Sequence, residues 1–421
     1  MRSIVIVGAG AAGLSVAYYL STLNQQIDFT CTLIDPDTKE ENDRTWAFWG
    51  GPFEFDHLVK KRWNYVDILT SQRRVRRESA GYRFIPADRF YAACLDRIRN
   101  DSRFTFLRAR AERIESEADR CTVTYRSFDG AAGALQSSEQ RTLSADYVVD
   151  SVFGSGLRVS GEAYDRARAH LRQSFVGWEV QTRVAQWDCD VATLMDFSER
   201  GSDFALEFHY VLPDSPTRAL CEYTTVDEAV PDQDYLEEQL ERYLDSTIGA
   251  GGWSIVRREK GTIPLFERTE PVFDGRVVYA GVSSGAARPS TGYAFRSIVE
   301  QAKDIAETLA ATPGTDRAGT RGVQRLPHAR SRPRFYDRVF LELLRRDSSV
   351  MPGALCSMFA GNSGERVFRF LAGRSTLADE ARIVWSLPWP PFLRALARLG
   401  GVRRAHSRQA APAMHSNVGN S

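Results

Sequence analysis

Three glycines and one acid near the start of the chain have the types and spacing of a dinucleotide-binding turn. The glycines lie in the run Gly8-Ala9-Gly10-Ala11-Ala12-Gly13, and Asp35 follows about 20 residues later. Gly8 would permit a tight turn, Gly10 would let the backbone approach a diphosphate, and Gly13 would let a helix pack closely on a strand. Asp35 could accept a hydrogen bond from a ribose hydroxyl.

The segments around this turn have the patterns needed to position it. Residues 3–7 are uncharged and mostly β-branched, which indicates a buried parallel strand, and residues 30–34 are similar. Residues 14–23 carry apolar side chains at helical spacing. The backbone N–H groups of Ala11 and Ala12, at the N-terminus of this helix, would point toward a diphosphate. The alternative is a glycine-rich turn in some other α/β protein.

Two later segments predict further strands of the same nucleotide-binding body. They are residues 145–150 and 275–281, and the second ends at Gly281. A glycine turn containing Gly292 and a predicted helix at 294–310 follow. A strand, a glycine turn and a helix N-terminus could again offer backbone N–H groups to a cofactor. An ordinary strand-to-helix connection is the alternative.

The middle of the chain has a different pattern, with alternating apolar residues and many aromatic side chains. Such alternation predicts an antiparallel sheet with one packed face, inserted into the body as a substrate lobe. Its clearest strands are residues 175–180, 204–212 and 218–225.

The predicted organisation is an α/β fold with a discontinuous body. The body comprises 1–160 and 266–312, the β-rich substrate lobe 161–265, a helical basic C-terminal region 313–405, and a disordered tail 406–421. The C-terminal region contains basic amphipathic pieces, which can lie on anionic membranes or form a solvated basic face.

Composition narrows the possible classes of protein. Among 421 residues, 43% are hydrophobic and 26% charged, which excludes wholesale disorder. The net charge of +1 gives no global electrostatic argument for binding nucleic acid. The six cysteines form no C-x-x-C pair, so we expect reduced thiols, no metal centre and a cytoplasmic location. No run is long and apolar enough to predict a transmembrane helix.

Several motifs occur in the same order as in bacterial lycopene β-cyclases, and the chain resembles that family over about residues 1–400. The motifs are NDRTWAF at 42–48, FVGWE at 175–179, LMDF at 194–197, ALCEYT at 219–224, GTIP at 261–264, PSTGY at 289–293, VFRFL at 367–371 and SLP at 386–388. Their shared order is more specific than any one of them.

The resemblance implies a Rossmann-like FAD-binding body of the glutathione-reductase type. Family members need FAD in its reduced form, with NAD(P)H as the electron source. They cyclise the ψ-end groups of lycopene to β-rings, through γ-carotene, without net oxidation. They work at a membrane surface, so we expect a peripheral protein on the cytoplasmic membrane. Arg44, in the first motif, is a further predicted cofactor contact, together with Gly281 and Gly292.

The cyclisation needs an acid that protonates an alkene and a base that removes a ring proton. Glu222 matches the proposed catalytic glutamate of the family and lies in an apolar, strand-like setting, where burial would keep a carboxyl neutral. Glu179 and Asp196 fall in family motifs and could supply the base or hold a network together. Tyr223 stands where plant relatives have a second glutamate, which argues against a glutamate pair at these two positions.

Aromatic side chains could stabilise the cation in a dry pocket. Trp46, Trp178 and Phe197 are candidates for this lining, although ordinary core packing would equally explain each one. Two other functions fit the same sequence. The first is an FAD-dependent redox enzyme, a prenyl reductase or monooxygenase acting on an isoprenoid or aromatic substrate, and the second is an isoprenoid carrier.

Overall fold

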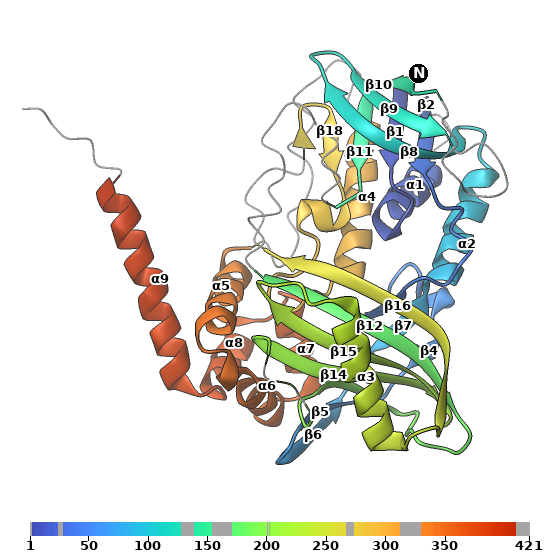
Figure 1. Ribbon diagram of the computed structural model, residues 1–421. Helices are drawn as coiled ribbons and strands as arrows, with labels where there is room; N and C mark the ends of the chain where they lie inside the picture. Colours follow the sequence, from blue (N-terminus) through green and yellow to red (C-terminus); the bar gives the residue numbers. More distant parts are fainter. Residues whose placement is uncertain are drawn as a thin grey trace, which may run out of the picture.

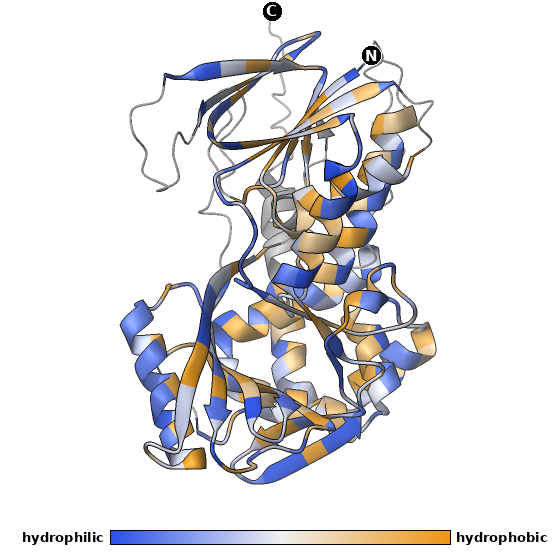
Figure 2. Ribbon diagram, turned by 90° about the vertical axis from the view of Figure 1, so that its right-hand side faces the viewer, coloured by the Kyte–Doolittle hydropathy of each residue, from blue (hydrophilic) through white to orange (hydrophobic). Residues whose placement is uncertain are grey.

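The computed structural model describes residues 2–23, 28–127, 139–153, 171–199, 201, 203–266, 273–311 and 330–409. It contains two large β-sheets, with the nucleotide-binding body at one end of the long axis and the lobe at the other (Figures 1 and 2). The predicted α/β architecture, with an inserted sheet lobe and a helical C-terminal region, is confirmed.

The body is built on an eight-stranded sheet with β1 near its centre. In spatial order the strands are β10 (Arg141–Ala145), β9 (Cys121–Ser127), β8 (Phe104–Ser116), β2 (Phe29–Asp35), β1 (Arg2–Val7), β11 (Tyr147–Asp150), β18 (Val277–Tyr279) and β17 (Phe273–Asp274). The strands from β8 to β18 pair in parallel. Helices α1 (Ala11–Thr22), α2 (Ala87–Arg99) and α4 (Phe295–Ala311) share one apolar core with this sheet.

The lobe contains a seven-stranded sheet. Its order is β16 (Trp253–Leu265), β12 (Leu171–Thr182), β15 (Arg218–Asp227), β14 (Leu206–Ser215), β13 (Val191–Asp196), β5 (Tyr65–Thr70) and β6 (Arg73–Glu78). Helix α3 (Gln233–Ile248) packs on β12 and β15. A small sheet of β3 (Thr45–Phe48), β7 (Arg83–Pro86) and β4 (Lys61–Arg62) links the two parts.

The lobe differs from the prediction in two respects. Strands β5 and β6 come from residues that the sequence placed in the body, and β13 pairs with β5 in parallel rather than antiparallel. Val66 and Ile68 of β5 are completely buried in the core of the lobe. Alternation identifies a strand, but it does not identify the sheet that the strand joins.

The C-terminal region forms helices α5 (Ser331–Arg346), α6 (Met351–Ala360), α7 (Gly364–Leu371), α8 (Leu377–Trp385) and α9 (Trp389–Gln409). Short 3-10 helices complete the described elements: η1 (Asp56–Leu58), η3 (Gly281–Ser284) and η6 (Ser348–Val350). Helix α9 runs past position 405, where the helical region was predicted to end. Two parts of the predicted regions lie outside the described residues: 313–329 of the C-terminal region and 410–421 of the tail.

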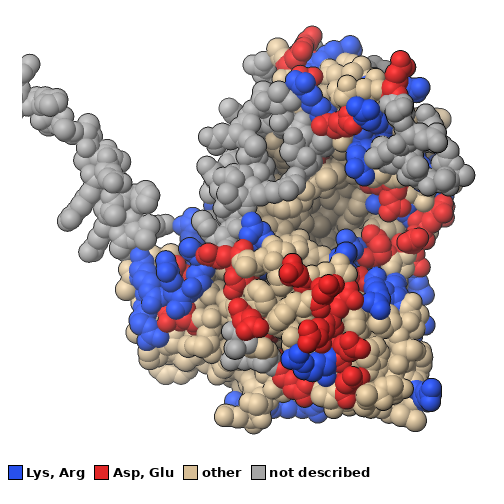
Figure 3. Space-filling view, in the orientation of Figure 1, with Lys and Arg blue, Asp and Glu red and all other residues tan. Residues whose placement is uncertain are grey.

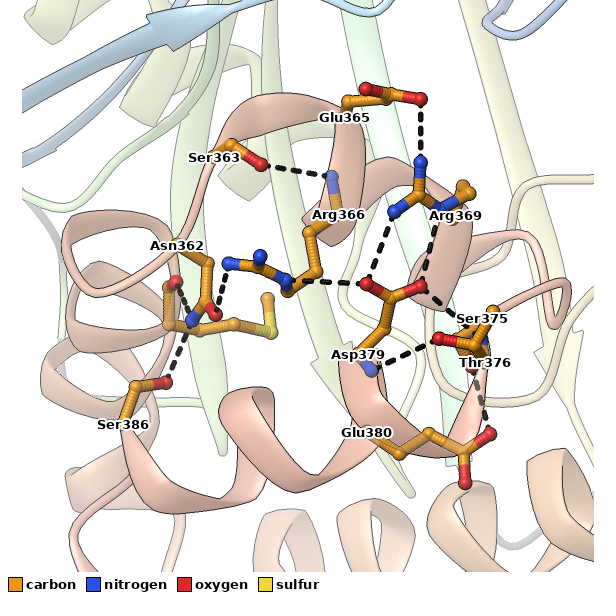
Figure 4. A network of polar contacts seen from close by, with 11 residues as sticks. Asn362, Ser363, Glu365, Arg366, Arg369, Ser375, Thr376, Asp379, Glu380 and Ser386 are labelled. Carbon is orange, nitrogen blue, oxygen red and sulfur yellow. Dashed lines mark hydrogen bonds and ion pairs between the residues drawn. The ribbon is translucent and has the colours of Figure 1, made fainter.

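A carboxylate joins helices α7 and α8 (Figure 4). Asp379 accepts hydrogen bonds from Arg366 and Arg369 and takes part in a capping box with Thr376 at the start of α8. Burial alone would raise the pKa of the Asp379 carboxyl, but the hydrogen bonds from Arg369 and Thr376 outweigh it and lower the pKa to about 2. The ion pairs therefore hold the two helices in a fixed arrangement.

Candidate active site

The glycine-rich turn has the geometry that a dinucleotide requires. Gly8 has a φ of 91°, and a Cβ atom at position 13 would lie 1.9 Å from the carbonyl oxygen of Gly8. The turn and helix α1 can approach this closely only because both residues are glycines. At Gly10, by contrast, a Cβ atom would meet no other atom within 4 Å, so the backbone faces open space where a diphosphate could approach.

Asp35 lies at the end of β2, as predicted, and holds the turn in place. One carboxylate oxygen accepts a hydrogen bond from the backbone N–H of Ala9 at 2.6 Å, and the other accepts from the N–H of Asp37 at 2.8 Å. Lys39 also pairs with this carboxylate at 3.3 Å. Asp35 thus fixes the backbone conformation of the turn, while its contact with a ribose stays a prediction.

The two late glycines connect the turn to the rest of the site. Gly281 has a φ of 71°, and a Cβ atom there would lie 2.6 Å from the Cβ of Ala12, so η3 packs directly against the first turn of α1. At Gly292 a Cβ atom would lie 2.5 Å from Oε1 of Gln173 in the lobe. Gly292 therefore lies where the body meets the lobe.

A cavity of about 680 Å³ opens at this meeting point. One face of the lobe sheet lines it, together with body residues around Gly292 and side chains from α5 to α9. Most lining residues are aliphatic or aromatic. Arg44, predicted to contact a cofactor, lines the cavity together with Trp46. The surface is also visibly hollowed between the body and the lobe (Figure 3).

Two glutamates meet inside this cavity across a glycine. Glu222 of β15 and Glu259 of β16 are both cross-strand partners of Gly177, in the strand between them. Cross-strand partners point to the same face of a sheet, so both side chains project into the cavity. A Cβ atom at Gly177 would lie 2.9 Å from Cγ of Glu222 and 3.1 Å from Cγ of Glu259. The glycine leaves the space in which the two side chains approach each other.

The environment of Glu222 favours a neutral carboxyl group. Burial and then the negative charge of Glu259 raise the pKa of Glu222 well above its ordinary value, and Arg257 opposes them weakly. Part of the Glu222 surface stays accessible, and the residue lines the mostly apolar cavity. The Glu222 and Glu259 side chains adjoin across Gly177, so one carboxyl group can donate a hydrogen bond to the other when one of them is protonated. Two adjoining carboxyl groups share a proton more readily than they ionise together.

Glu259 was missed by the sequence analysis. Its Oε2 atom accepts a hydrogen bond from the hydroxyl of Thr45 at 2.8 Å and pairs with Nη1 of Arg257 at 2.5 Å. Glu259 lies two residues before the GTIP motif, so its place in a family segment was visible. Its pairing with Gly177 depended on strand register, which the motif did not reveal.

The other two predicted acids lie elsewhere. Glu179 pairs with Arg218 at 2.7 Å, Arg257 at 3.2 Å and Lys60 at 3.7 Å. Burial alone would raise the pKa of Glu179, but these ion pairs outweigh it and lower the pKa. Asp196 accepts a hydrogen bond from Tyr243 of α3 at 3.1 Å. Neither belongs to the described lining of the cavity, so the geometry favours structural roles for both.

Aromatic side chains surround the glutamate pair, although only some of them were predicted. Trp46 lines the cavity and stacks on Phe295 with ring centroids 4.9 Å apart, whereas Trp178 and Phe197 lie outside the described lining. Tyr210, the cross-strand partner of Glu222, and Tyr293 line the cavity as well. Their hydroxyl groups both contact the buried hydroxyl of Tyr82, at 2.9 Å for Tyr293.

Comparisons with known proteins identify the family of this chain. Residues 3–397 match the family model described as "Lycopene cyclase protein". A lycopene beta-cyclase from Pantoea ananas is 25% identical over 413 residues, covering 93% of this chain and 96% of that protein. One from a Paracoccus species is 29% identical over 310 residues, covering 68% and 78%.

Solved structures share the fold at low sequence identity. A geranylgeranyl bacteriochlorophyll reductase-like protein from Thermoplasma acidophilum has a TM-score of 0.61 at 11% identity, covering 94% of this chain and 96% of its own. Klebsiella pneumoniae HpxO complexed with FAD and uric acid has a TM-score of 0.59 at 16% identity, covering 92% and 98%. The fold is thus that of FAD-containing proteins, and the family match over nearly the whole length shows that this chain belongs to the lycopene cyclase family.

Proposed function

We propose that this protein is a lycopene β-cyclase, which converts the ψ-end groups of lycopene to β-rings through γ-carotene, with no net redox change. The observation that carries this proposal is the position of Glu222, whose carboxyl group lines an apolar cavity of a lycopene cyclase family member, where burial raises its pKa. A neutral carboxylic acid can protonate an alkene, whereas a carboxylate cannot. The names of the relatives support lycopene as the substrate.

In the proposed reaction, Glu222 donates its proton to the terminal double bond of the polyene. The resulting tertiary cation is attacked by the neighbouring alkene, and the six-membered ring closes. Trp46, Tyr210 and Tyr293 would stabilise the positive charge, since aromatic faces attract cations in a site that excludes water. Loss of a ring proton then gives the β-ring.

Reduced FAD is the proposed cofactor, with NAD(P)H as the source of electrons. The turn from Gly8 to Gly13 and the N-terminus of α1 would hold its diphosphate, and Arg44 and the backbone at Gly292 would contact it from the cavity side. The open space at Gly10 supports this fit. When bound, a reduced flavin would supply negative charge near the developing cation, and it undergoes no net oxidation.

The proposed location is the cytoplasmic face of a membrane, from which a fully apolar polyene could enter the cavity. Among the residues that the structure describes, seven of the twelve exposed large apolar side chains lie on α5, α8 and α9, and we call these seven the docking face. They are Phe335, Leu377, Val384, Trp385, Trp389, Leu393 and Leu396. Five of the seven also line the cavity, so its mouth lies at this face.

The distribution of surface charge also supports an orientation in which the docking face lies against the membrane. Exposed arginines, including Arg382 and Arg394, accompany the docking face, and Figure 3 shows basic side chains on the side where α5 and α9 lie. Acidic side chains gather over α3, on the outer surface of the lobe. Anionic lipid would attract the first surface and repel the second. Among the described residues, no helix is both long enough and apolar enough to cross a bilayer, so the proposed contact is peripheral.

Pigment analysis in a bacterial host that accumulates lycopene tests the proposed function. Expression of this chain should produce γ- or β-carotene, and expression of Glu222→Gln should leave lycopene intact. Unchanged lycopene beside folded, flavin-loaded parent protein would contradict the proposal. The alternative, an FAD-dependent redox enzyme, would consume NAD(P)H in proportion to product, whereas a cyclase needs reductant only to keep the flavin reduced.

A further inference from the structure

We propose that Glu259 is a second catalytic carboxyl, the base that removes the ring proton, and that it returns this proton directly to the adjoining carboxyl group of Glu222. The inference rests on the proposed cyclase function and adds to it the identity of the base and the way in which the acid is restored.

The first argument is position. Tyr210, Glu222, Gly177 and Glu259 form one row across four neighbouring strands, β14, β15, β12 and β16. A side chain at position 177 would separate the glutamates, because even a Cβ atom there would lie 2.9 Å from Glu222 and 3.1 Å from Glu259. Both glutamates therefore reach the cavity side by side.

The second argument is the arrangement of the two proton transfers. In the ring closure, the carbon that gains a proton and the ring carbon that loses one are both bonded to the same quaternary carbon. They are therefore close neighbours. Two adjoining carboxyl groups in contact with the ring can serve both carbons without any movement of the substrate between the steps. A base on the opposite wall of the cavity would need the ring to turn over.

The third argument is the unequal surroundings of the two groups. Arg257 and Thr45 both donate hydrogen bonds to Oε2 of Glu259, and charge-assisted hydrogen bonds favour a carboxylate. Glu222 has no comparable cation at hydrogen-bonding distance among the described contacts, and it faces the apolar cavity. The shared proton therefore resides on Glu222, which leaves Glu259 ready to accept another.

The cycle balances in atoms and charge. The O–H bond of Glu222 breaks as a C–H bond forms at the terminal double bond, and the neighbouring alkene supplies the electron pair of the new ring bond. A ring C–H bond then breaks, its electrons form the ring double bond, and its proton binds Glu259. Transfer of this proton to Glu222 restores the starting state, so each end group leaves with the same composition, although one of its hydrogen atoms has been exchanged.

The decisive experiment compares purified, flavin-loaded parent protein with Glu259→Gln and Glu222→Gln, using lycopene in D₂O. In Glu259→Gln, Glu222 still protonates the alkene, but the designated base is missing. We expect β-ring formation to fall by about a hundredfold or more, which is typical for loss of a general base. Recovered lycopene should carry deuterium in its end groups, and any rings should include isomers with the double bond in another position. Lycopene recovered from Glu222→Gln should carry no deuterium.

Two controls separate a catalytic role from a structural one. Glu207→Gln removes a buried carboxylate of β14 that binds the backbone N–H groups of Asp203 and Phe204, outside the described lining of the cavity, and it should leave the rate unchanged. Glu259→Asp retains a carboxylate, so the reaction should be slower but should give only β-rings. Flavin content and melting temperature are measured for every variant.

The outcomes distinguish the two proposals. If the parent protein forms no β-rings from lycopene, the proposed function fails. If the parent forms them and Glu259→Gln forms β-rings at more than about half its rate, only the role of Glu259 is refuted. The role of Glu259 is equally refuted if lycopene recovered from folded Glu259→Gln contains no deuterium, because protonation would then have been lost together with deprotonation.

Discussion

Gly177→Ala tests the contact between the two glutamates without changing any ionisable group. The added Cβ atom would lie 2.9 Å from Cγ of Glu222 and 3.1 Å from Cγ of Glu259. Carbon atoms prefer separations of about 3.5–4.0 Å, so each side chain must retreat by roughly 0.5–1 Å. A misplacement of about 1 Å can cost about a hundredfold in rate. We therefore expect a hundredfold loss of β-ring formation, which corresponds to about 2.7 kcal/mol.

The fold should tolerate this change. Alanine is favoured over glycine in a strand interior by about 0.5–1 kcal/mol, and both opposing atoms belong to side chains that can rotate. Gly353→Ala is the matched control, because a Cβ atom at this exposed position of α6 would meet no other atom within 4 Å. The assay is the initial rate of β-ring formation at equal flavin content. A full rate in Gly177→Ala would refute the idea that the carboxyl groups must touch.

Three further predictions concern the cofactor, the membrane and stability. Gly13→Ala should abolish flavin retention, measured by absorbance of the purified protein, because its Cβ would lie 1.9 Å from the Gly8 carbonyl oxygen. The double variant Trp385→Ala, Trp389→Ala should bind anionic vesicles at least about tenfold more weakly in a sedimentation assay. It removes roughly 200 Å² of exposed aromatic surface, and burial of only about a third of that area in the bilayer, at about 25 cal/mol per Å², already corresponds to more than tenfold in affinity. Unchanged binding would place the docking face elsewhere. Asp379→Asn should destabilise the protein by about 1–2 kcal/mol at pH 7 after allowance for solvent screening. Because folding lowers the pKa of Asp379 to about 2, this difference should disappear as the pH falls from about 4 toward 2, and urea unfolding at both ends of that range measures it.

The body could be predicted from sequence because its signals are local. The strand, glycine turn and helix at the start of the chain lie within a few residues of their predicted bounds, as does α4. A buried parallel strand and a glycine that must adopt positive φ both act through immediate neighbours. The lobe is different, since β5 joins it from about 120 residues upstream of β13, its parallel partner. No local pattern specifies that pairing.

The family motifs located Glu222, but they did not reveal its partner Glu259. Glu222 lies in a motif that the family shares, so resemblance alone located it. Its neighbour in sequence, Tyr223, points to the opposite face of β15 and packs with His209 and α3. A carboxyl group at position 223 would therefore lie on the face of the sheet away from Glu222. The partner is Glu259, two strands away, and only the register through Gly177 brings it to Glu222.

A group of ion pairs lies behind the two glutamates of the cavity. Arg257 binds Glu259 with one nitrogen and Glu179 with another, and Arg218 and Lys60 balance Glu179 from the other side. Positive charge is therefore concentrated behind Glu259 and away from Glu222. In the proposed mechanism, this asymmetry makes Glu222 the proton donor and Glu259 the proton acceptor of the pair before the substrate arrives. Glu179 would then contribute to the reaction by holding Arg257 in place, without any contact with the polyene.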